Sequence, residues 1–135
     1  MVKIELLEYD PVTDQWEDNT GMSEARYHGT VSVVNGKIYA IGGVFNWVCS
    51  ASVEEYDPLT DTWRECADMP IVRCDISSGV VNGKIYVFGG WNDGGFLRNV
   101  DEYTPPEGKS PEKPQQAVNL QGKLISTWSA IKNRP

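Results

Sequence analysis

A ten-residue segment that ends in two glycines occurs twice in this chain, with its copies 47 residues apart. The copies read VNGKIYAIGG over 34–43 and VNGKIYVFGG over 81–90. A constant period of this size predicts stacked copies of one small unit instead of a single conventional core. The same offset relates several larger side chains: Tyr9, Tyr56 and Tyr103; Trp16 and Trp63; Met22 and Met69; Arg26 and Arg73.

Each unit begins with two strand-forming runs around a short turn. The runs at 31–34 and 37–41 flank Asn35-Gly36, and the second copy repeats the arrangement. Asn-Gly favours a type I′ hairpin because both central residues take positive φ. The sequence therefore predicts an antiparallel hairpin in each unit.

Two further strands are expected in each unit. The segment 53–56 alternates apolar and polar residues, as does a half-buried strand, and it is echoed at 6–9 and 100–103. Turn-forming residues occupy 57–61, and Trp63 lies in a fourth strand that begins at Thr62. No window has a helical period, so the chain is predicted to be all-β, with four-stranded antiparallel units.

These features resemble the kelch-repeat family, in which a Gly-Gly doublet follows the second strand and is followed by a spaced Tyr and Trp. Here Gly42-Gly43 precedes Tyr56 and Trp63, whereas Gly89-Gly90 precedes Tyr103 without a following Trp. The resemblance covers about residues 4–104 and implies kelch-type β-propeller blades. It is closest to the kelch domains of BTB-kelch adaptors, which select substrates for cullin-type ubiquitin ligases.

The resemblance divides the chain into four parts. Residues 1–22 match the second half of a blade, 23–69 a complete repeat, 70–104 a partial repeat, and 105–135 a Pro-rich, weakly ordered tail. Nine strands make about two blades plus a leading strand pair, whereas a closed propeller has about five to seven blades. This partial propeller is therefore either a fragment of a larger one or a protomer that assembles, for example as a trimer in which the leading pair finishes a neighbour's last blade.

Composition excludes some partners. The chain has 19 acidic against 12 basic residues and a net charge of −7, which disfavours nucleic acid as the main partner. No apolar run approaches the 18 residues or so of a membrane span, and the start does not read as a signal peptide. Cys49, Cys66 and Cys74 show no CxxC spacing. We expect free thiols and a cytoplasmic protein.

Ten residues are candidates for partner binding. In adaptor-type kelch domains, the turn before the first strand and the loop after the doublet line one mouth of the ring, where peptides bind. Carried over by position, these are Arg26, Tyr27, Val44, Phe45, Trp47, Arg73, Cys74, Trp91, Asn92 and Phe96. The resemblance implies that an Arg holds a partner carboxylate and that Trp91 is an anchor. The alternative is that both arginines only bond neighbouring backbone or pack between blades.

The recurring Tyr and Trp residues are expected to pack between blades, since aromatic burial dominates core energetics. Catalytic chemistry is sparse. His28 is the only histidine, so no His-rich metal site is expected, and no catalytic residue or cofactor is assigned. Glu54 and Glu55 are adjacent on a strand and should face opposite sides of it.

The sequence thus favours a protein–protein interaction module that recognises a protein or peptide partner and is not an enzyme. The resemblance implies that this module is part of a cullin-type ubiquitin-ligase adaptor. Two alternatives remain open. One is a kelch-type enzyme that acts on a sugar or small metabolite, and the other is a self-assembling structural propeller fragment.

Overall fold

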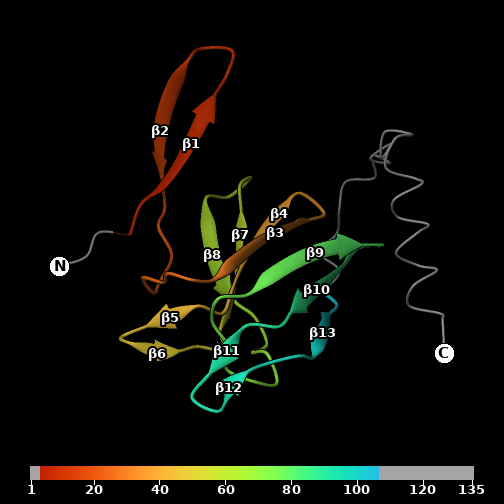
Figure 1. Cartoon of the computed structure of the whole chain (residues 1–135). Coiled ribbons are helices and arrows are strands. Elements are labelled where there is room, and N and C mark those ends of the chain that lie inside the picture. The colour runs from red at the N-terminus through yellow and green to blue at the C-terminus, as the bar shows by residue number, and fades with distance from the viewer. Residues whose placement is uncertain (1–3, 107–135) are drawn as a thin grey trace.

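The computed structural model describes residues 4–106; the predicted tail at 105–135 lies almost entirely outside the described residues. Within 4–106 every regular element is a strand, which confirms the all-β prediction (Figure 1). Nine longer strands form the sheets: β1 Leu6–Asp10, β2 Gln15–Asn19, β3 Thr30–Val34, β4 Lys37–Ile41, β7 Val53–Asp57, β8 Thr62–Glu65, β9 Ser77–Val81, β10 Lys84–Phe88 and β13 Val100–Tyr103. Four two-residue strands complete the set: β5 Val44–Phe45, β6 Val48–Cys49, β11 Trp91–Asn92 and β12 Gly95–Phe96.

The sheets follow the repeat. The complete unit is a four-stranded sheet in the order β3-β4-β7-β8, and the next unit is a three-stranded sheet with β10 between β9 and β13. β1 and β2 pair only with each other. All pairings are antiparallel, and consecutive strands are neighbours, so each sheet is a meander. The fold is therefore a partial propeller, as predicted.

The Asn-Gly turns have the backbone conformation that the sequence predicts. Asn35 and Gly36 have φ values of 51° and 75°, and Asn82 and Gly83 have 50° and 72°. Positive φ at both central positions is the signature of the type I′ turn, whose twist matches that of the strands. These local rules set the register of both hairpins, with Val34 opposite Lys37.

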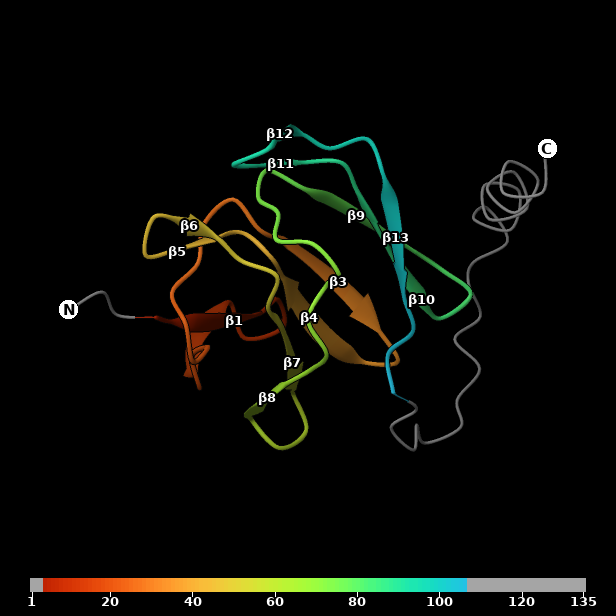
Figure 2. The same cartoon turned by 90° about the horizontal axis from the view of Figure 1, so that it is seen from below.

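The two sheets pack face to face, with β3 and β9 side by side (Figures 1 and 2). Hydroxyl groups join these strands, because Ser78 Oγ lies 2.8 Å from both Thr30 Oγ1 and Ser32 Oγ. The rings of Tyr39 and Tyr103 meet edge to face at 6.1 Å. The core between the sheets consists of buried residues from both units: Val34, Tyr39, Ile41, Val53, Ile76, Ile85 and Val87.

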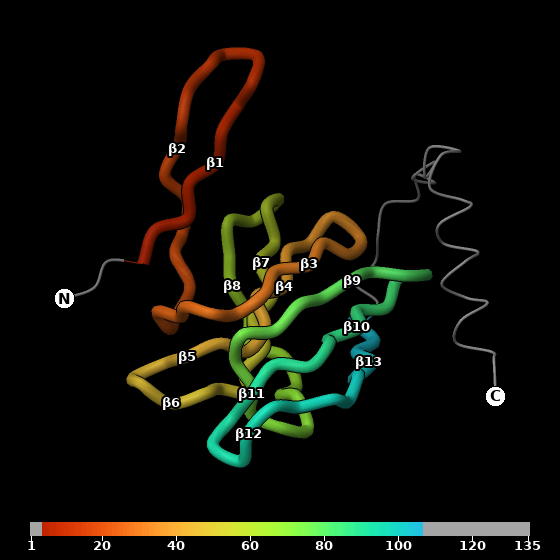
Figure 3. Tube along the Cα trace, in the orientation of Figure 1, coloured from red at the N-terminus to blue at the C-terminus, as the bar shows by residue number. Residues whose placement is uncertain are grey.

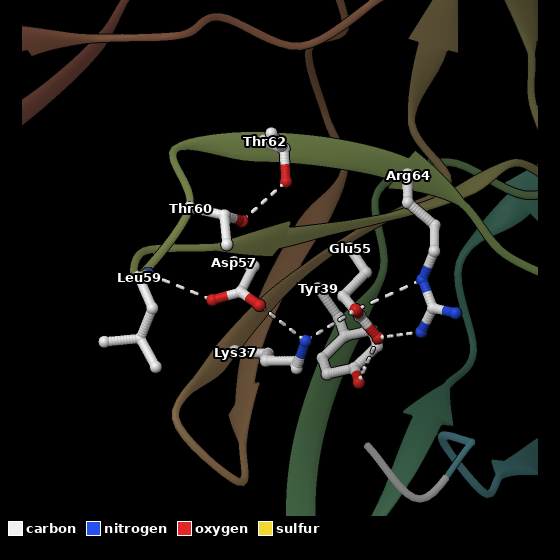
Figure 4. A network of polar contacts seen from close by, with 8 residues as sticks. All are labelled: Lys37, Tyr39, Glu55, Asp57, Leu59, Thr60, Thr62 and Arg64. Carbon is white, nitrogen blue, oxygen red and sulfur yellow. Dashed lines mark hydrogen bonds and ion pairs between the residues drawn. The ribbon is translucent and has the colours of Figure 1, made fainter. Parts of the chain in front are cut away.

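A buried carboxylate organises the outer part of this interface (Figure 4). Glu55 accepts hydrogen bonds from Tyr39 Oη at 2.7 Å and from Arg64 Nη2 at 2.7 Å, and Lys37 Nζ lies 3.3 Å away. Burial alone would raise the pKa of Glu55, but these donors outweigh it, and the pKa lies below its ordinary value. Glu54 instead pairs with Arg26, so the two glutamates face opposite sides, as predicted.

The aromatic pairs repeat but differ in burial. Tyr9–Trp16 and Tyr56–Trp63 both have ring centroids 5.1 Å apart. Tyr56 is buried and Trp63 half-buried, with Trp63 Nε1 donating to Thr20 O at 2.6 Å. Trp16, however, is 66% exposed. The prediction that every copy packs between blades is wrong for Trp16, because its hairpin has only two strands and stands away from the other sheets (Figure 3).

The two strands of the leading hairpin correspond to the third and fourth strands of a complete unit. Among residues 4–106 the last sheet has three strands, of which β13 is the third. β1 is also a third strand, since Tyr9 and Tyr103 occupy equivalent positions of the repeat. A neighbour's hairpin would therefore bring a further third strand together with a fourth. Assembly into a ring stays a prediction.

Candidate functional site

Four segments meet at one end of the sheets and form the surface that we call the rim. They are two leading turns, at 26–29 and 73–76, and two rim hairpins, at 44–49 and 91–96. In the first repeat Val44 N–H donates to Tyr27 O at 2.7 Å. In the second, Cys74 and Trp91 exchange two backbone hydrogen bonds of 3.0 Å. Figure 1 shows both rim hairpins at the end of the molecule opposite the β7–β8 turn.

The glycine doublets allow this close approach. Gly43 has a φ of 94°, and a Cβ there would lie 2.7 Å from Tyr27 O. Gly90 has a φ of 87°, and its Cβ would lie 2.5 Å from Cys74 O. Side chains would clash with backbone at both positions. The doublet therefore lets each rim hairpin lie directly against its leading turn.

Large aromatic side chains cover the rim. Trp47 and Phe96 are 91% and 92% exposed, and Tyr27 and Trp91 are also exposed. The Tyr27 and Trp47 rings meet edge to face at 6.3 Å. The remaining predicted members of the first hairpin, Val44 and Phe45, are half-buried. The exposed rings form an aromatic surface. Backbone hydrogen bonds between the leading turns and the rim hairpins hold the chain beneath it in place.

Trp47 also has an unusual backbone conformation. It lies at the tip of the first rim hairpin with a φ of 66°, beside Asn46 with a φ of 48°. A bulky residue in this left-handed region is a genuine outlier, and such strain concentrates at binding sites. In the second rim hairpin the residue with positive φ is a glycine, Gly95, at 106°.

The two predicted arginines are not available to a partner. Arg73 is fully buried; its Nη1 donates to Gly89 O at 3.2 Å, and its Nη2 contacts Asp101 at 2.5 Å. Arg26 repeats the arrangement with Gly42 O and Glu54. These contacts match the alternative assignment, in which the arginines bond the backbone and pack within the fold. Their donors satisfy buried carbonyl and carboxylate groups and so face inward.

The cysteines are not all free, which corrects the expectation from their spacing. A disulfide joins Cys49 and Cys74, whose Cα atoms lie 5.4 Å apart, and Cys66 is a half-buried free thiol. Cys74 is 1% exposed and so does not contact a partner directly. The bond ties β6 of the first repeat to the leading turn of the second. Both rim hairpins are thus linked into one surface.

A polar chain crosses the rim between repeats. His28 Nδ1 donates to one carboxylate oxygen of Asp75, and Trp91 Nε1 donates to the other at 2.9 Å. The hydrogen bond from His28 holds the pKa of Asp75 below its ordinary value against the opposing effect of burial, and the hydrogen bond from Trp91 adds a smaller contribution in the same direction. Asp75 N–H also donates to His28 O at 2.8 Å. These contacts fix the orientation of Trp91.

A small cavity of about 190 Å³ lies between the two rim hairpins. Its lining consists of Val48, Cys49, Val72, Asn92, Asp93 and Gly94. Asn92 uses its amide inside the protein, donating to Val72 O at 3.0 Å and accepting from Gly94 N–H at 2.9 Å. Of this lining, only Asn92 was among the sequence candidates. Val48 and Asp93 are in the predicted loops and were missed because neither carries a recurring motif.

Between residues 4 and 106, no group of three or more His, Cys, Asp or Glu side chains is placed to hold a metal ion. The same residues include no helix long and apolar enough to cross a membrane.

Comparison with known proteins identifies the repeat. The family model described as the Kelch motif matches residues 25–70 and 73–109. The human protein "Kelch repeat and BTB domain-containing protein 12" is 44% identical over 39 residues, which are 29% of this chain and 6% of that protein. The chain thus spans a small part of this curated relative.

A solved structure supports the fold. The chain is similar to the structure titled "Structure of YjhT", with a TM-score of 0.59 and 24% identity, over 65% of this chain and 27% of that one. At this identity the likeness concerns the fold alone. Kelch repeats generally bind protein partners. Because the matched segments cover more than half of the sequence, this chain belongs to the kelch-motif family.

Proposed function

We propose that the rim binds an extended segment of a partner protein. The observation that carries this proposal is Trp47, which is 91% exposed at a hairpin tip and held at a φ of 66°. A tryptophan in this conformation costs free energy and gains little from burial, so a contact outside the chain explains it better than packing does. Tryptophan and tyrosine are also the residues that most often dominate interface affinity.

The shape of the rim supports a protein partner over a small molecule. The cavity of about 190 Å³ is smaller than the roughly 300–1,000 Å³ of small-molecule sites. It has room for one side chain of a longer ligand. Contiguous exposed apolar surface of this kind is typical of interaction sites. Trp91 and Phe96 extend that surface to the second repeat.

The wider role that we propose is substrate recognition for a cullin-type ubiquitin ligase. The supporting observation is the similarity to a relative whose name combines kelch repeats with a BTB domain. In such an adaptor the kelch part selects the substrate while another domain docks to the ligase. This role would place the chain in the cytoplasm, where the Cys49–Cys74 bond would form only under oxidation.

The proposal is tested with one substitution that separates binding from stability. Peptides that bind the full 135-residue chain are first selected from a random peptide display library. The Trp47→Gly variant is then compared with the Leu59→Ala variant, since Leu59 is 86% exposed at the opposite end. We expect Trp47→Gly to weaken binding at least tenfold while the unfolding midpoint stays equal or rises, because glycine accepts positive φ.

Equal binding by wild type and the Trp47→Gly variant would contradict the proposed rim. Loss of binding in the Leu59→Ala variant would instead place the site at the other end of the sheets.

A further inference from the structure

The exposed part of the rim is acidic, although Arg26 and Arg73 in its sequence suggest a basic surface. The two arginines of the leading turns are buried in ion pairs with Glu54 and Asp101. Across 26–29, 44–49, 72–76 and 91–96 there is no other Lys or Arg. The exposed charged groups of these segments are the carboxylates of Asp75 and Asp93. The face presented to a partner is therefore acidic and aromatic.

Asp93 is the carboxylate best placed for a ligand. It lines the cavity between the rim hairpins and is exposed. Within residues 4–106 its carboxylate accepts no hydrogen bond, whereas Asp75 is engaged with His28 and Trp91. The lining also includes the apolar residues Val48 and Val72. A ligand with an apolar group next to a cation would match this lining, because the apolar group could contact the valines and the cation could pair with Asp93.

The exposed rings favour the same ligand. Tyr27 and Trp47 form an edge-to-face pair at the tip of the first rim hairpin. The face of a Trp or Tyr ring attracts Lys or Arg cations, and Trp does so most strongly. An acidic ligand would meet like charge at Asp75 and Asp93, and the rim segments themselves offer it no exposed guanidinium.

From these observations we infer that the rim selects a peptide in which an arginine or lysine adjoins an apolar residue. The apolar side chain fills the cavity between Val48 and Val72, and the cation pairs with Asp93. A second cation on the other side of the apolar residue lies over Trp47. The inference rests on the proposed function, because it specifies the chemistry of the partner at the same rim.

The test uses three synthetic peptides that differ only in charge. Each has a central leucine flanked on both sides by arginine, glutamine or glutamate within a Gly-Ser sequence. Each is titrated into the ¹⁵N-labelled full chain, and the amide and indole signals of the rim are followed by NMR. We expect the arginine peptide to bind at least fivefold more tightly than the glutamine peptide, and the glutamate peptide more weakly than either.

Two charge-reversed variants supply the matched control. Asp93→Lys should weaken binding of the arginine peptide about fivefold or more and should reduce its salt dependence. Asp18→Lys changes the net charge equally but lies on β2, in the leading hairpin, and should leave the affinity within twofold. Amide dispersion in both spectra verifies folding.

The outcomes separate this inference from the proposed function. Rim signals that move equally for all three peptides would overturn the charge preference while the rim remains a peptide site. Equal losses in Asp93→Lys and Asp18→Lys would overturn the role of Asp93. If no peptide moves the rim signals, while peptides selected from the display library still bind there, the preference for a cation beside leucine is wrong. If those selected peptides also fail to bind at the rim, the proposed function fails too.

Discussion

His28 and Asp75 occupy equivalent positions of successive repeats, and the imidazole of the first donates to the carboxylate of the second. Both residues have positive φ, of 59° and 53°. The second oxygen of Asp75 holds the indole of Trp91. One side chain therefore connects the two leading turns to the second rim hairpin, and the exposed aromatic surface is held by contacts that cross the repeat.

The Asp75→Asn variant should loosen the hold on Trp91. His28 and Trp91 contact two different oxygens of Asp75, and an amide replaces one of these oxygens with an NH2 group and removes the charge. In either orientation of the amide the indole loses its charged acceptor, so its hydrogen bond is weaker or absent and the indole N–H should exchange faster with solvent. The measurement is the hydrogen-exchange rate of the Trp91 indole by NMR. Asp18→Asn, in the leading hairpin, is the matched control. An unchanged exchange rate in Asp75→Asn would show that this carboxylate does not hold the ring.

Glu55 should make the stability depend on pH. Its pKa is lowered in the folded chain, so its contribution is present at neutral pH and is lost as the pH falls through and below the ordinary value of 4.5. Glu55→Gln removes the charge of a buried carboxylate whose partner Arg64 is half-exposed, and should cost about 1–3 kcal/mol at pH 7. Urea unfolding at pH 7, 4.5 and 3 measures this difference. We expect the two proteins to converge at the lowest pH; a constant difference would contradict the role assigned to the charge.

The disulfide should stabilise the fold under oxidising conditions. Cys49 and Cys74 close a loop of 25 residues in sequence, for which a chain-entropy estimate is about 3 kcal/mol. Cys49→Ser should lower the free energy of unfolding by this amount and should abolish its response to a reducing agent. Cys66→Ser, which changes the free thiol, should respond to the reducing agent as the wild type does. Loss of the response in both variants would point to a different pairing.

Trp63 and Trp16 provide a matched test of the packing between units. Trp63 is half-buried and bonds Thr20 O, whereas Trp16 is mostly exposed. Trp63→Ala should cost less than the roughly 3–5 kcal/mol of a fully buried tryptophan, but clearly more than Trp16→Ala. Thermal unfolding of the two variants gives the comparison. Equal costs would mean that the segment around Thr20 does not pack on β8 in solution.

Much of the fold could be predicted because its determinants are local or periodic. Asn35-Gly36 specifies its turn through φ alone, and the 47-residue offset transfers that conformation to Asn82-Gly83. Such features do not depend on distant parts of the chain. The prediction of a half-buried strand at 53–56 is wrong, because all four residues are buried and the two glutamates are held in ion pairs with arginines.

The rim was harder to predict, since its details depend on contacts between repeats. The two-residue strands of the rim hairpins are too short to show a pattern. The pairing of Cys49 with Cys74 follows only from the way that the second leading turn lies against β6. The sequence does contain one signal for the buried arginines. The offset that relates Arg26 to Arg73 also relates Glu54 to Asp101, which are their acidic partners.

The most direct test of the rim as the binding face is hydrogen–deuterium exchange of the full chain with and without a selected peptide. We expect bound peptide to protect the backbone amides of the rim hairpins at 44–49 and 91–96, and to leave the turn at 57–61 unchanged. Protection confined to the 57–61 turn or to the leading hairpin, with no change at the rim, would contradict the account.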